Sequence, residues 1–224
     1  MRRQPLFRQV EPAQVDIMLR GSFLQRFPAH VELLHDGEMA DFLHIVIEGR
    51  VELYSSYRDR ETTLSFAVPG ESFVLAAVLM DLPYLQSARG LIASRILMVP
   101  ADAVREAFAS DPNFARTLAE ELALSYRGVV KELKNQKLRS GLERLANWLL
   151  TRDAECGATG RFDFPFGKKV LASRLGMAPE VLSRTLTALA AYHVVVQGAA
   201  VVMNDVDALR KLAHPSSGID GSAT

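Results

Sequence analysis

The segment Gly167–Ala191, GKKVLASRLGMAPEVLSRTLTALAA, decides the fold of the C-terminal part of the chain. Its first half carries Leu171 and Leu175 four positions apart, a spacing that predicts an amphipathic helix. Gly176 follows, and glycine tolerates the positive φ that a sharp turn requires. Pro179 then suits the first position of a second helix, because proline lacks the backbone N–H that would have no partner there. The segment therefore predicts a helix-turn-helix.

The second helix of this motif carries polar side chains on the face opposite its leucines. Glu180, Ser183 and Arg184 lie near its beginning, where helices that read the DNA major groove place their base contacts. Arg184 can donate two hydrogen bonds to guanine O6 and N7, Glu180 can accept one from cytosine N4, and Ser183 can reach a thymine edge. We predict that these three residues read DNA bases. The alternative is a helical hairpin that only packs.

Charge supports this assignment weakly. Lys and Arg total 26, as do Asp and Glu, which argues against a protein that coats nucleic acid indiscriminately. The net charge is −3 over residues 1–136 and +3 over residues 137–224, so positive charge leans toward the predicted DNA-binding end. Lys168, Lys169 and Arg174 are candidates for contacts to DNA phosphates, with a merely solvated cluster as the alternative.

Composition excludes several classes of protein. The chain has 224 residues, 49% of them hydrophobic, which is enough for one large or two small domains with real cores. The longest apolar run is Phe73–Met80, far too short to span a membrane, and the N-terminus lacks a signal-peptide pattern. We therefore expect a cytoplasmic protein without a membrane partner. Cys156 is the only cysteine, which excludes an intrachain disulfide.

Upstream of the helix-turn-helix, the hydrophobic period changes toward two. Residues 12–27 show a mixed pattern that predicts one or two short helices. Turn signals such as Asp36-Gly37 and Pro69-Gly70 separate the strand-like runs that follow. These runs are 30–33, 43–47, 51–54, 63–68, 88–94 and 96–99. Short strands with such regular punctuation predict a small β-roll.

A long helix is predicted after the roll. Asp111-Pro112 supplies an N-cap and a first-turn proline, and the helix continues to about Lys137, roughly 37 Å at 1.5 Å per residue. That length exceeds what a small domain needs, so we predict a dimer helix. The alternative is a helix that lies along its own roll, because Ser125 interrupts the apolar stripe. The predicted interface residues are Phe114, Leu118, Leu122, Val129 and Leu133.

The remaining segments complete a winged helix-turn-helix. They are a break at 139–141, a helix from 142, an edge strand at 162–166, a hairpin at 194–203 as the wing, a helix ending near Leu212, and a small polar tail. The predicted fold class is thus α+β. Its expected parts are a sensory β-roll with N-terminal helices at 1–110, a dimerisation helix at 111–138, a winged helix-turn-helix at 139–214 and a disordered tail at 215–224.

This order of elements resembles the CRP/FNR family of bacterial transcription regulators. Asp36-Gly37-Glu38, Glu48-Gly49-Arg50-Val51 and Pro69-Gly70-Glu71 resemble the glycine turns of its cyclic-nucleotide-binding roll. Glu180-Val181-Leu182-Ser183-Arg184 resembles the E-x-x-S-R pattern of the FNR branch. The segments 137–150 and 175–180 are similar to members that respond to nitrogen oxides. The resemblance implies a twofold dimer that reads an inverted repeat of TTGAT-like half-sites, about 34 Å apart.

Two positions depart from the family pattern. Ala178 stands where the family has Ser or Thr as the N-cap of the reading helix, and its loss costs about 1 kcal/mol of helix stability. Val170 replaces a common acidic residue of the first helix. Neither change removes a base-reading group, so we expect an effect on affinity rather than on specificity.

The sensory roll also departs from cyclic-nucleotide binders. The resemblance implies a phosphate site made of an arginine and a Gly-Glu pair, since a buried anion needs a cation and hydrogen-bond donors. Leu75 and Ala76 stand near the Gly-Glu position, and 86–88 reads Gln-Ser-Ala where Arg-Ser-Ala is expected. Cyclic AMP is therefore disfavoured, unless Arg89 takes the role of the arginine. Phe73, Leu75 and Arg89 are the candidate effector-pocket residues.

The same family resemblance limits which metal-based sensors can be expected. An FNR-type iron-sulfur cluster is disfavoured because its N-terminal cysteines are absent. A haem, another small apolar ligand, or no effector remain as alternatives, and no metal site is predicted. His30, His35 and His44 are the candidate axial ligands for a haem, although strand and loop histidines more often have no such role.

The predicted function is a homodimeric transcription regulator that binds double-stranded DNA and responds to a redox or gaseous signal such as nitric oxide. RNA polymerase is an expected partner if the protein activates transcription. The alternative is a binding protein of the same fold for a cyclic nucleotide or another small molecule. An enzyme is not predicted, because the chain has no phosphate-cradling loop, no H-E-x-x-H and no G-x-S-x-G.

Overall fold

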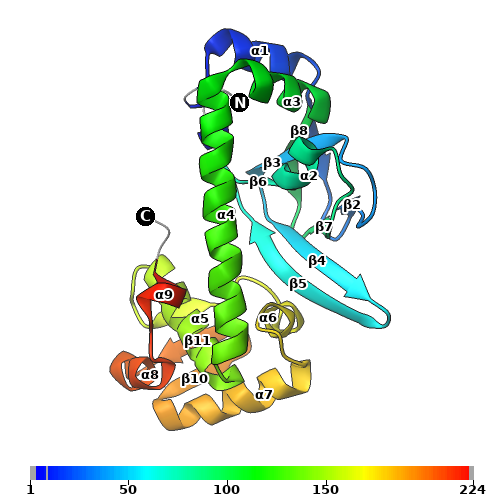
Figure 1. The fold of residues 1–224 in the computed structure, drawn as a ribbon. Coiled ribbons are helices and arrows are strands. Elements are labelled where there is room, and N and C mark those ends of the chain that lie inside the picture. Colours follow the sequence, from blue (N-terminus) through cyan, green and yellow to red (C-terminus); the bar gives the residue numbers. More distant parts are fainter. Residues whose placement is uncertain (1–3, 9, 222–224) are drawn as a thin grey trace. The chain divides into compact units, whose positions relative to one another are not determined.

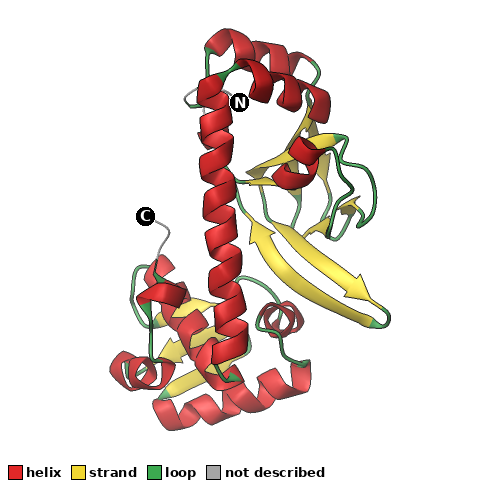
Figure 2. Ribbon diagram, viewed as in Figure 1, coloured by secondary structure: helices red, strands yellow, loops and turns green. Residues whose placement is uncertain are grey.

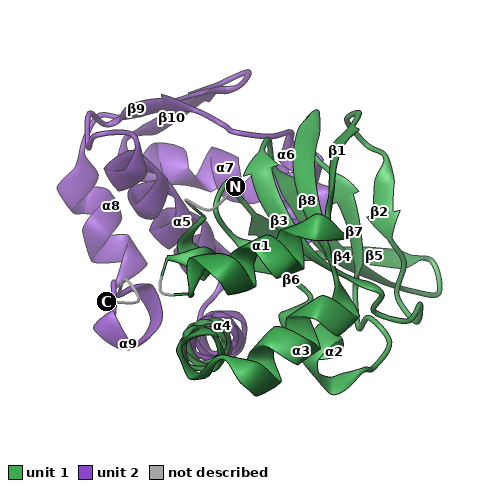
Figure 3. Cartoon of the chain, turned by 90° about the horizontal axis from the view of Figure 1, so that it is seen from above, with its two compact units in different colours: residues 1–125 green, residues 126–224 purple. Residues whose placement is uncertain are grey.

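The computed structural model describes residues 4–8 and 10–221 (Figure 1). The chain forms two compact units, residues 1–125 and 126–224, coloured green and purple in Figure 3. The division falls inside helix α4, Pro112–Leu138. Each unit combines helices with β-strands, so the predicted α+β class is confirmed (Figure 2). Within the described part of the chain, no helix is both long and apolar enough to cross a membrane.

Unit 1 contains the predicted β-roll, built from two four-stranded antiparallel sheets. The first sheet has the order β1 (Phe23–Phe27), β8 (Ser94–Pro100), β3 (Phe42–Glu48) and β6 (Ser72–Phe73). The second has the order β2 (Glu32–Leu34), β7 (Ser87–Gly90), β4 (Val51–Tyr57) and β5 (Arg60–Ala67). Ile45 pairs with Leu97 in one sheet and Leu53 with Ala88 in the other, and all four side chains are buried.

Three helices accompany the roll: α1 (Pro12–Arg20), α2 (Leu75–Met80) and α3 (Ala101–Ser110). The segment 12–27 is therefore not helical throughout, and this part of the sequence prediction is wrong. Its second half is strand β1, which pairs with β8 from Phe23↔Met98 to Phe27↔Ser94. The aromatic residues of this segment suit a strand, and their partner strand lies far away in the sequence, where a local pattern cannot reveal it.

Helix α4 begins at a side-chain cap. Oδ1 of Asp111 accepts hydrogen bonds from the backbone N–H of Asn113 at 2.9 Å and of Phe114 at 3.2 Å. Phe114 and Leu118 are fully buried in the core of unit 1, which corrects their assignment to a dimer interface. A side chain with no exposed area cannot contact a second chain. Leu122 is partly buried against the same core.

The apolar residues further along α4 are exposed. Val129 is 63% exposed and Leu133 is 56% exposed. The sequence pattern placed Ser125 in this apolar stripe. In the structure, Tyr126 takes that place and is 70% exposed. The spacing of 3 and 4 residues puts these three side chains on one face of the helix. The second half of α4 therefore offers an uncovered apolar face.

Unit 2 is a winged helix-turn-helix. It contains helix α5 (Gly141–Glu155), the helix-turn-helix pair α6 (Lys168–Arg174) and α7 (Pro179–Ala188), the 3-10 turn η2 (Leu189–Tyr192), and helices α8 (Val206–Ala213) and α9 (Ser217–Asp220). A three-stranded sheet has the order β10 (Val194–Gln197), β11 (Ala200–Met203) and β9 (Arg161–Asp163). The core is formed by leucines of these helices, among them Leu145, Leu149, Leu171, Leu182 and Leu189.

The break between α4 and α5 is short and strongly capped. Ser140 accepts the backbone N–H of Glu143 at 3.2 Å, and the Glu143 carboxylate accepts the backbone N–H of Ser140 at 2.7 Å. This capping box satisfies two backbone donors at the start of α5. The hydrogen bonds from Ser140 lower the pKa of Glu143, which keeps the box in its charged form.

The C-terminal segment is ordered, in contrast to the disordered tail expected at 215–224. Ser217–Asp220 forms α9, and Asp220 makes an ion pair with Arg139. This contact spans most of unit 2, so the small polar composition of the tail could not indicate it. Residues 222–224 of the expected tail lie outside the described residues.

Candidate DNA-binding site

Helices α6 and α7 meet at a turn that requires glycine. Gly176 has φ +63°, and a Cβ at this position would lie 2.5 Å from Oε1 of Gln136 on α4. The backbone N–H of Met177 donates to the carbonyl of Ala172 at 3.0 Å, and this bond closes the turn. Any side chain at 176 would be strained and would also displace the Gln136 amide. The predicted helix-turn-helix is thus present with its glycine in the predicted place.

Helix α7 begins at Pro179, and its N-cap residue, Ala178, has no side chain that can cap it. The sequence indicated this departure correctly. Pro179 occupies the first turn and Glu180 is the acidic residue of that turn. The core holds the register of the helix, because Leu182 and Leu186 are buried. The opposite face of α7 is thereby directed away from the core.

That opposite face carries the predicted base-reading residues. Glu180, Ser183 and Arg184 are all exposed, so the structure brings the three together on the first two turns of α7. Nε of Arg184 donates to the carbonyl of Glu180 at 3.4 Å, a long hydrogen bond that contributes little. Exchanging this bond for a contact to guanine would therefore cost little.

Sequence reasoning missed one residue of this face. Thr187 is exposed and lies one helical turn after Ser183, whose carbonyl accepts the Thr187 hydroxyl at 3.1 Å. The four-residue spacing from Ser183 was the signal that could have identified it. Thr187 extends the exposed polar face toward the middle of a site that α7 would read.

The candidate phosphate-binding residues separate into two groups. Lys168 and Lys169 are exposed at the beginning of α6. Arg174, at the end of α6, instead forms an ion pair with Glu132 of α4 at 3.0 Å. Both partners of this pair are partly buried. The structure therefore places Arg174 against α4 and not beside the two lysines.

Arg144 of α5 fixes the turn of the helix-turn-helix. Its Nε donates to the carbonyl of Leu175 at 2.9 Å, and its Nη1 donates to the carbonyl of Arg139 at 2.8 Å. One guanidinium thus bridges the α4–α5 break and the turn that precedes α7. Rigid support of this kind is what a reading helix needs, because base contacts tolerate little displacement.

In unit 1, the structure does not bring the three candidate effector-pocket residues together. Phe73 and Leu75 are buried in the core of the roll. On β7, Ala88 belongs to the same core, and successive side chains of a strand point to opposite faces. Arg89 therefore points away from the face that holds Phe73 and Leu75.

Arg89 is held on the outer face by two carboxylates. Its Nε donates to buried Glu52 at 2.8 Å, and its Nη2 donates to Glu61 at 2.8 Å. The guanidinium also lies 4.2 Å from the centroid of the Tyr54 ring. The hydrogen bonds that Arg89 donates to Glu61 are the main cause that raises the pKa of Arg89, so the guanidinium remains charged on this face.

The candidate haem ligands differ sharply in burial. His30 and His35 are exposed, whereas His44 is 2% exposed. Its ring stacks on Phe73 with 5.1 Å between centroids, and its Nδ1 has no hydrogen-bond partner. Burial lowers the pKa of His44 to about 4, so the ring is neutral near pH 7.

The surroundings of His44 do not fit a haem. An axial ligand needs space for a porphyrin against its ring nitrogen, but the rings of Phe73 and Tyr84 lie against His44. Among the described residues, no group of three or more His, Cys, Asp or Glu side chains is placed to hold a metal ion.

Comparisons with known proteins match both units. The model of the cyclic nucleotide-binding domain matches residues 24–111, and the model of the Crp-like helix-turn-helix domain matches residues 143–212. The curated Cyclic AMP receptor protein of Thermus thermophilus is 28% identical over 205 residues, covering 90% of this chain and 93% of that protein.

Solved structures agree with these matches. A putative cAMP-binding regulatory protein from Silicibacter pomeroyi is 27% identical, with a TM-score of 0.60 and 94% of each chain covered. A putative transcriptional regulator of the CRP/FNR family from Eubacterium rectale has a TM-score of 0.77 at 18% identity, covering 94% of this chain and 98% of that one. At that identity the second likeness shows the fold alone.

Proposed function

The chain belongs to the CRP/FNR family of transcription regulators, and from this premise we propose that it acts as a homodimer on an inverted repeat of TTGAT-like half-sites. One observation carries the choice of half-site. Glu180, Ser183 and Arg184 share an exposed face at the beginning of α7, in the E-x-x-S-R pattern of the FNR-like branch. Arginine paired with guanine and glutamate paired with cytosine supply the discrimination between bases.

The proposed dimer uses the second half of α4. Tyr126, Val129 and Leu133 form an exposed apolar stripe with the 3 and 4 residue spacing of a coiled-coil seam. A twofold axis along this seam would present two copies of α7 to successive major grooves, about 34 Å apart. The proposal does not include Phe114 and Leu118, which are buried within one chain.

We further propose that the roll answers a redox or gaseous signal such as nitric oxide. The support is the apolar character of the sensory core around Phe73 and Leu75, together with the sequence likeness at 137–150 and 175–180. In the described part of unit 1 no lysine or arginine is fully buried, so an enclosed cation for a charged ligand is absent there.

A cyclic nucleotide is the alternative signal. It is favoured by the match to the cyclic nucleotide-binding domain and by the printed names of the relatives from Thermus thermophilus and Silicibacter pomeroyi. Two features of this chain disfavour a cyclic nucleotide: the family resemblance puts Leu75 and Ala76 near the position of the Gly-Glu pair, and Arg89 is paired with Glu52. If the protein activates transcription, RNA polymerase is the proposed partner, and the cytoplasm is the proposed location.

In vitro selection tests the DNA-binding proposal. Purified full-length protein is incubated with random duplex DNA, and dissociation constants are measured for the selected duplex at fixed salt. We expect a TTGAT-like inverted repeat, with a loss of about tenfold to a hundredfold in Arg184→Ala. Arg210→Ala, which removes an exposed arginine on α8, is the matched control. Absence of any enriched duplex, or equal loss in both variants, would overturn the proposal.

Binding measurements distinguish the two signals. Calorimetric titration with cyclic AMP should show no binding, whereas nitric oxide under anaerobic conditions should change the affinity for the selected duplex. Saturable binding of cyclic AMP, together with no response to nitric oxide, would replace the first signal by the alternative.

A further inference from the structure

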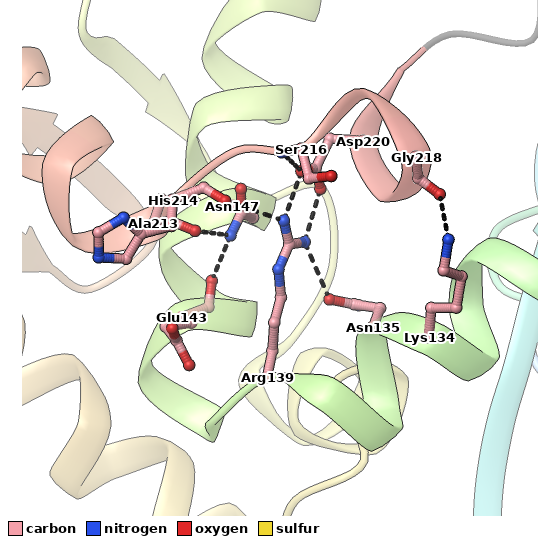
Figure 4. A network of polar contacts seen from close by, with 10 residues as sticks. All are labelled: Lys134, Asn135, Arg139, Glu143, Asn147, Ala213, His214, Ser216, Gly218 and Asp220. Atoms are coloured by element: carbon pink, nitrogen blue, oxygen red, sulfur yellow. Dashed lines mark hydrogen bonds and ion pairs between the residues drawn. The ribbon is translucent and has the colours of Figure 1, made fainter.

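A buried arginine stands at the break between α4 and α5. The Arg139 side chain is 6% exposed, although arginine is almost never fully buried without a partner. Its guanidinium meets the carboxylate of Asp220 in a two-pronged ion pair, with Nη1 2.6 Å from Oδ1 and Nη2 donating to Oδ2 (Figure 4). Nη1 also donates to Oδ1 of Asn135 at 3.2 Å, and Nη2 to the carbonyl of His214 at 3.5 Å.

Residues 214–221, which we call the C-terminal strap, are attached at further points. The strap holds its own Asp220 through the backbone N–H of Ser216, at 2.7 Å. Lys134 of α4 donates to the carbonyl of Gly218 at 3.4 Å, and Lys131 donates to the carbonyl of Gly221. The strap is thus bound along the last turns of α4 (Figure 4).

The segment just before the strap is tied to α5. Nδ2 of buried Asn147 donates to the carbonyl of Ala213 at 2.6 Å and to the carbonyl of Glu143 at 2.9 Å (Figure 4). The chain from Ala213 to Gly221 therefore contacts the helices on both sides of the break. A segment with this placement can fix the direction in which α5 leaves α4.

The charges of the pair depend on one another. The hydrogen bond to Asp220 raises the pKa of Arg139, against the effect of burial. Burial works to raise the pKa of Asp220, but hydrogen bonds from Arg139 and Ser216 and the charges of Arg139 and Lys131 outweigh it and leave that pKa lowered. Removal of one partner would leave the other as an unpaired charge in a poorly solvated place, which is strongly unfavourable.

We propose that the C-terminal strap positions the reading helix, with Arg139 and Asp220 as positioning residues for DNA recognition. The connection is continuous within unit 2. Asp220 holds the Arg139 side chain, the Arg139 carbonyl accepts Nη1 of Arg144, and Nε of Arg144 donates to Leu175 in the turn before α7. This inference rests on the proposed DNA-binding function, because it concerns how two copies of α7 are spaced.

A rigid break between α4 and α5 has a specific effect in a twofold dimer. Both reading helices engage at once only if the operator offers its half-sites at the matching separation. If the break between α4 and α5 is loosened, the two copies of α7 occupy several separations. Only one of these separations matches the best operator, so the affinity for that operator falls. The same looseness allows operators with altered spacing to bind almost as well.

The test measures spacing preference in the full chain. Operators derived from the selected duplex have one base pair added to or removed from the spacer, and dissociation constants are compared at fixed salt. We expect the wild type to lose about tenfold on each altered spacer, and Asp220→Asn to lose less than about threefold relative to its own best operator. Asp207→Asn is the matched control, because it removes a carboxylate from an exposed pair with Arg210 in the same unit.

A conservative variant provides a further control. Asp220→Glu keeps the charge and should restore the spacing preference, which separates positioning from general loss of folding. Equal proportional loss on every spacer in Asp220→Asn would overturn the positioning role.

If the wild-type protein selects no duplex, the proposed DNA-binding function itself has failed. In that case, amide hydrogen exchange tests whether the C-terminal strap stabilises the break between α4 and α5. Faster exchange at residues 139–147 in Asp220→Asn than in Asp207→Asn supports this role. Equal exchange at residues 139–147 in the two variants overturns this role of the strap.

Discussion

The guanidinium of Arg174 in α6 lies 3.0 Å from the carboxylate of Glu132 in α4, and both side chains are partly buried. A candidate phosphate contact is therefore occupied by a carboxylate of the same chain. Gln136, which donates to the same Glu132 carboxylate at 2.8 Å, lies against Gly176 in the turn of the reading motif. These contacts hold the first helix of the motif at the end of α4.

The first prediction concerns this ion pair. Glu132→Gln releases Arg174, and we expect about twofold to threefold tighter DNA binding with a salt dependence steeper by about one counterion. The measurement is the dissociation constant over a range of salt concentrations. Glu120→Gln is the control, since Glu120 also lies on α4 and pairs with Arg116 at the surface. An identical response of the two variants would contradict the prediction.

The second prediction concerns the uncapped start of α7. Ala178→Ser supplies a side-chain acceptor for the first backbone N–H groups, so the free energy of unfolding should rise by about 1 kcal/mol. Denaturant unfolding measures this gain. Ala188→Ser, at the other end of the same helix, has no such donors to cap and should give none. A gain of equal size at both positions would contradict the capping argument.

The third prediction concerns acid stability. His44 is neutral when folded because burial lowers its pKa to about 4, whereas the unfolded chain titrates near the ordinary value of 6.5. The stability due to neutral His44 is thus complete above pH 6.5, declines as the pH falls toward 4, and changes no further below that. The decline should be about 3 kcal/mol.

Unfolding curves at several pH values check this expectation. His44→Leu should lose that part of the pH dependence, while His30→Gln, which changes an exposed histidine, should keep it. A wild type and a His44→Leu variant with parallel pH profiles would show that His44 does not cause the decline.

The fourth prediction concerns assembly. Val129→Asp places a charge in the exposed apolar stripe of α4 and should convert the proposed dimer to a monomer, because an unpaired charge in a dimer core is unfavourable. Light scattering after size exclusion measures the mass. Tyr57→Asp, at the 73% exposed tip of the β4–β5 hairpin, is the control and should leave the mass unchanged. A dimer that persists in Val129→Asp would argue for another interface.

Much of the fold could be predicted because local signals sufficed for it. Alternating residues predicted the strands of the roll, and the Leu171, Leu175 and Gly176 pattern predicted the helix-turn-helix. The exposed face of α7 followed from the spacing of its buried leucines. In the helix-turn-helix, the periodicity of one short segment already determines which side chains are buried, whereas β3 and β4 each bury four successive residues.

The failures share a different cause. Phe23–Phe27 pairs with β8, and Asp220 pairs with Arg139, and in both cases the partner lies more than 60 residues away in the sequence. Phe114 and Leu118 fit a dimer stripe equally well by spacing, and only the roll packed against them shows which surface they serve. Spacing gives the face of a helix but not the neighbour that covers it. Arg89 was assigned to the effector pocket. The alternation of side chains along the strand, with Ala88 on the core face, could have placed it on the opposite face.

The division between the two units at residue 125 falls inside the continuous helix α4. A helix cut there leaves about four carbonyls on one side and about four N–H groups on the other without partners. The residues at the cut, Ser125 and Tyr126, are followed closely by Gly128 and two valines, a combination that supports a helix poorly on its own. A chain that began at residue 126 would therefore have no N-terminal cap on its part of α4. We expect a fragment that starts at 126 to fray from its first turn.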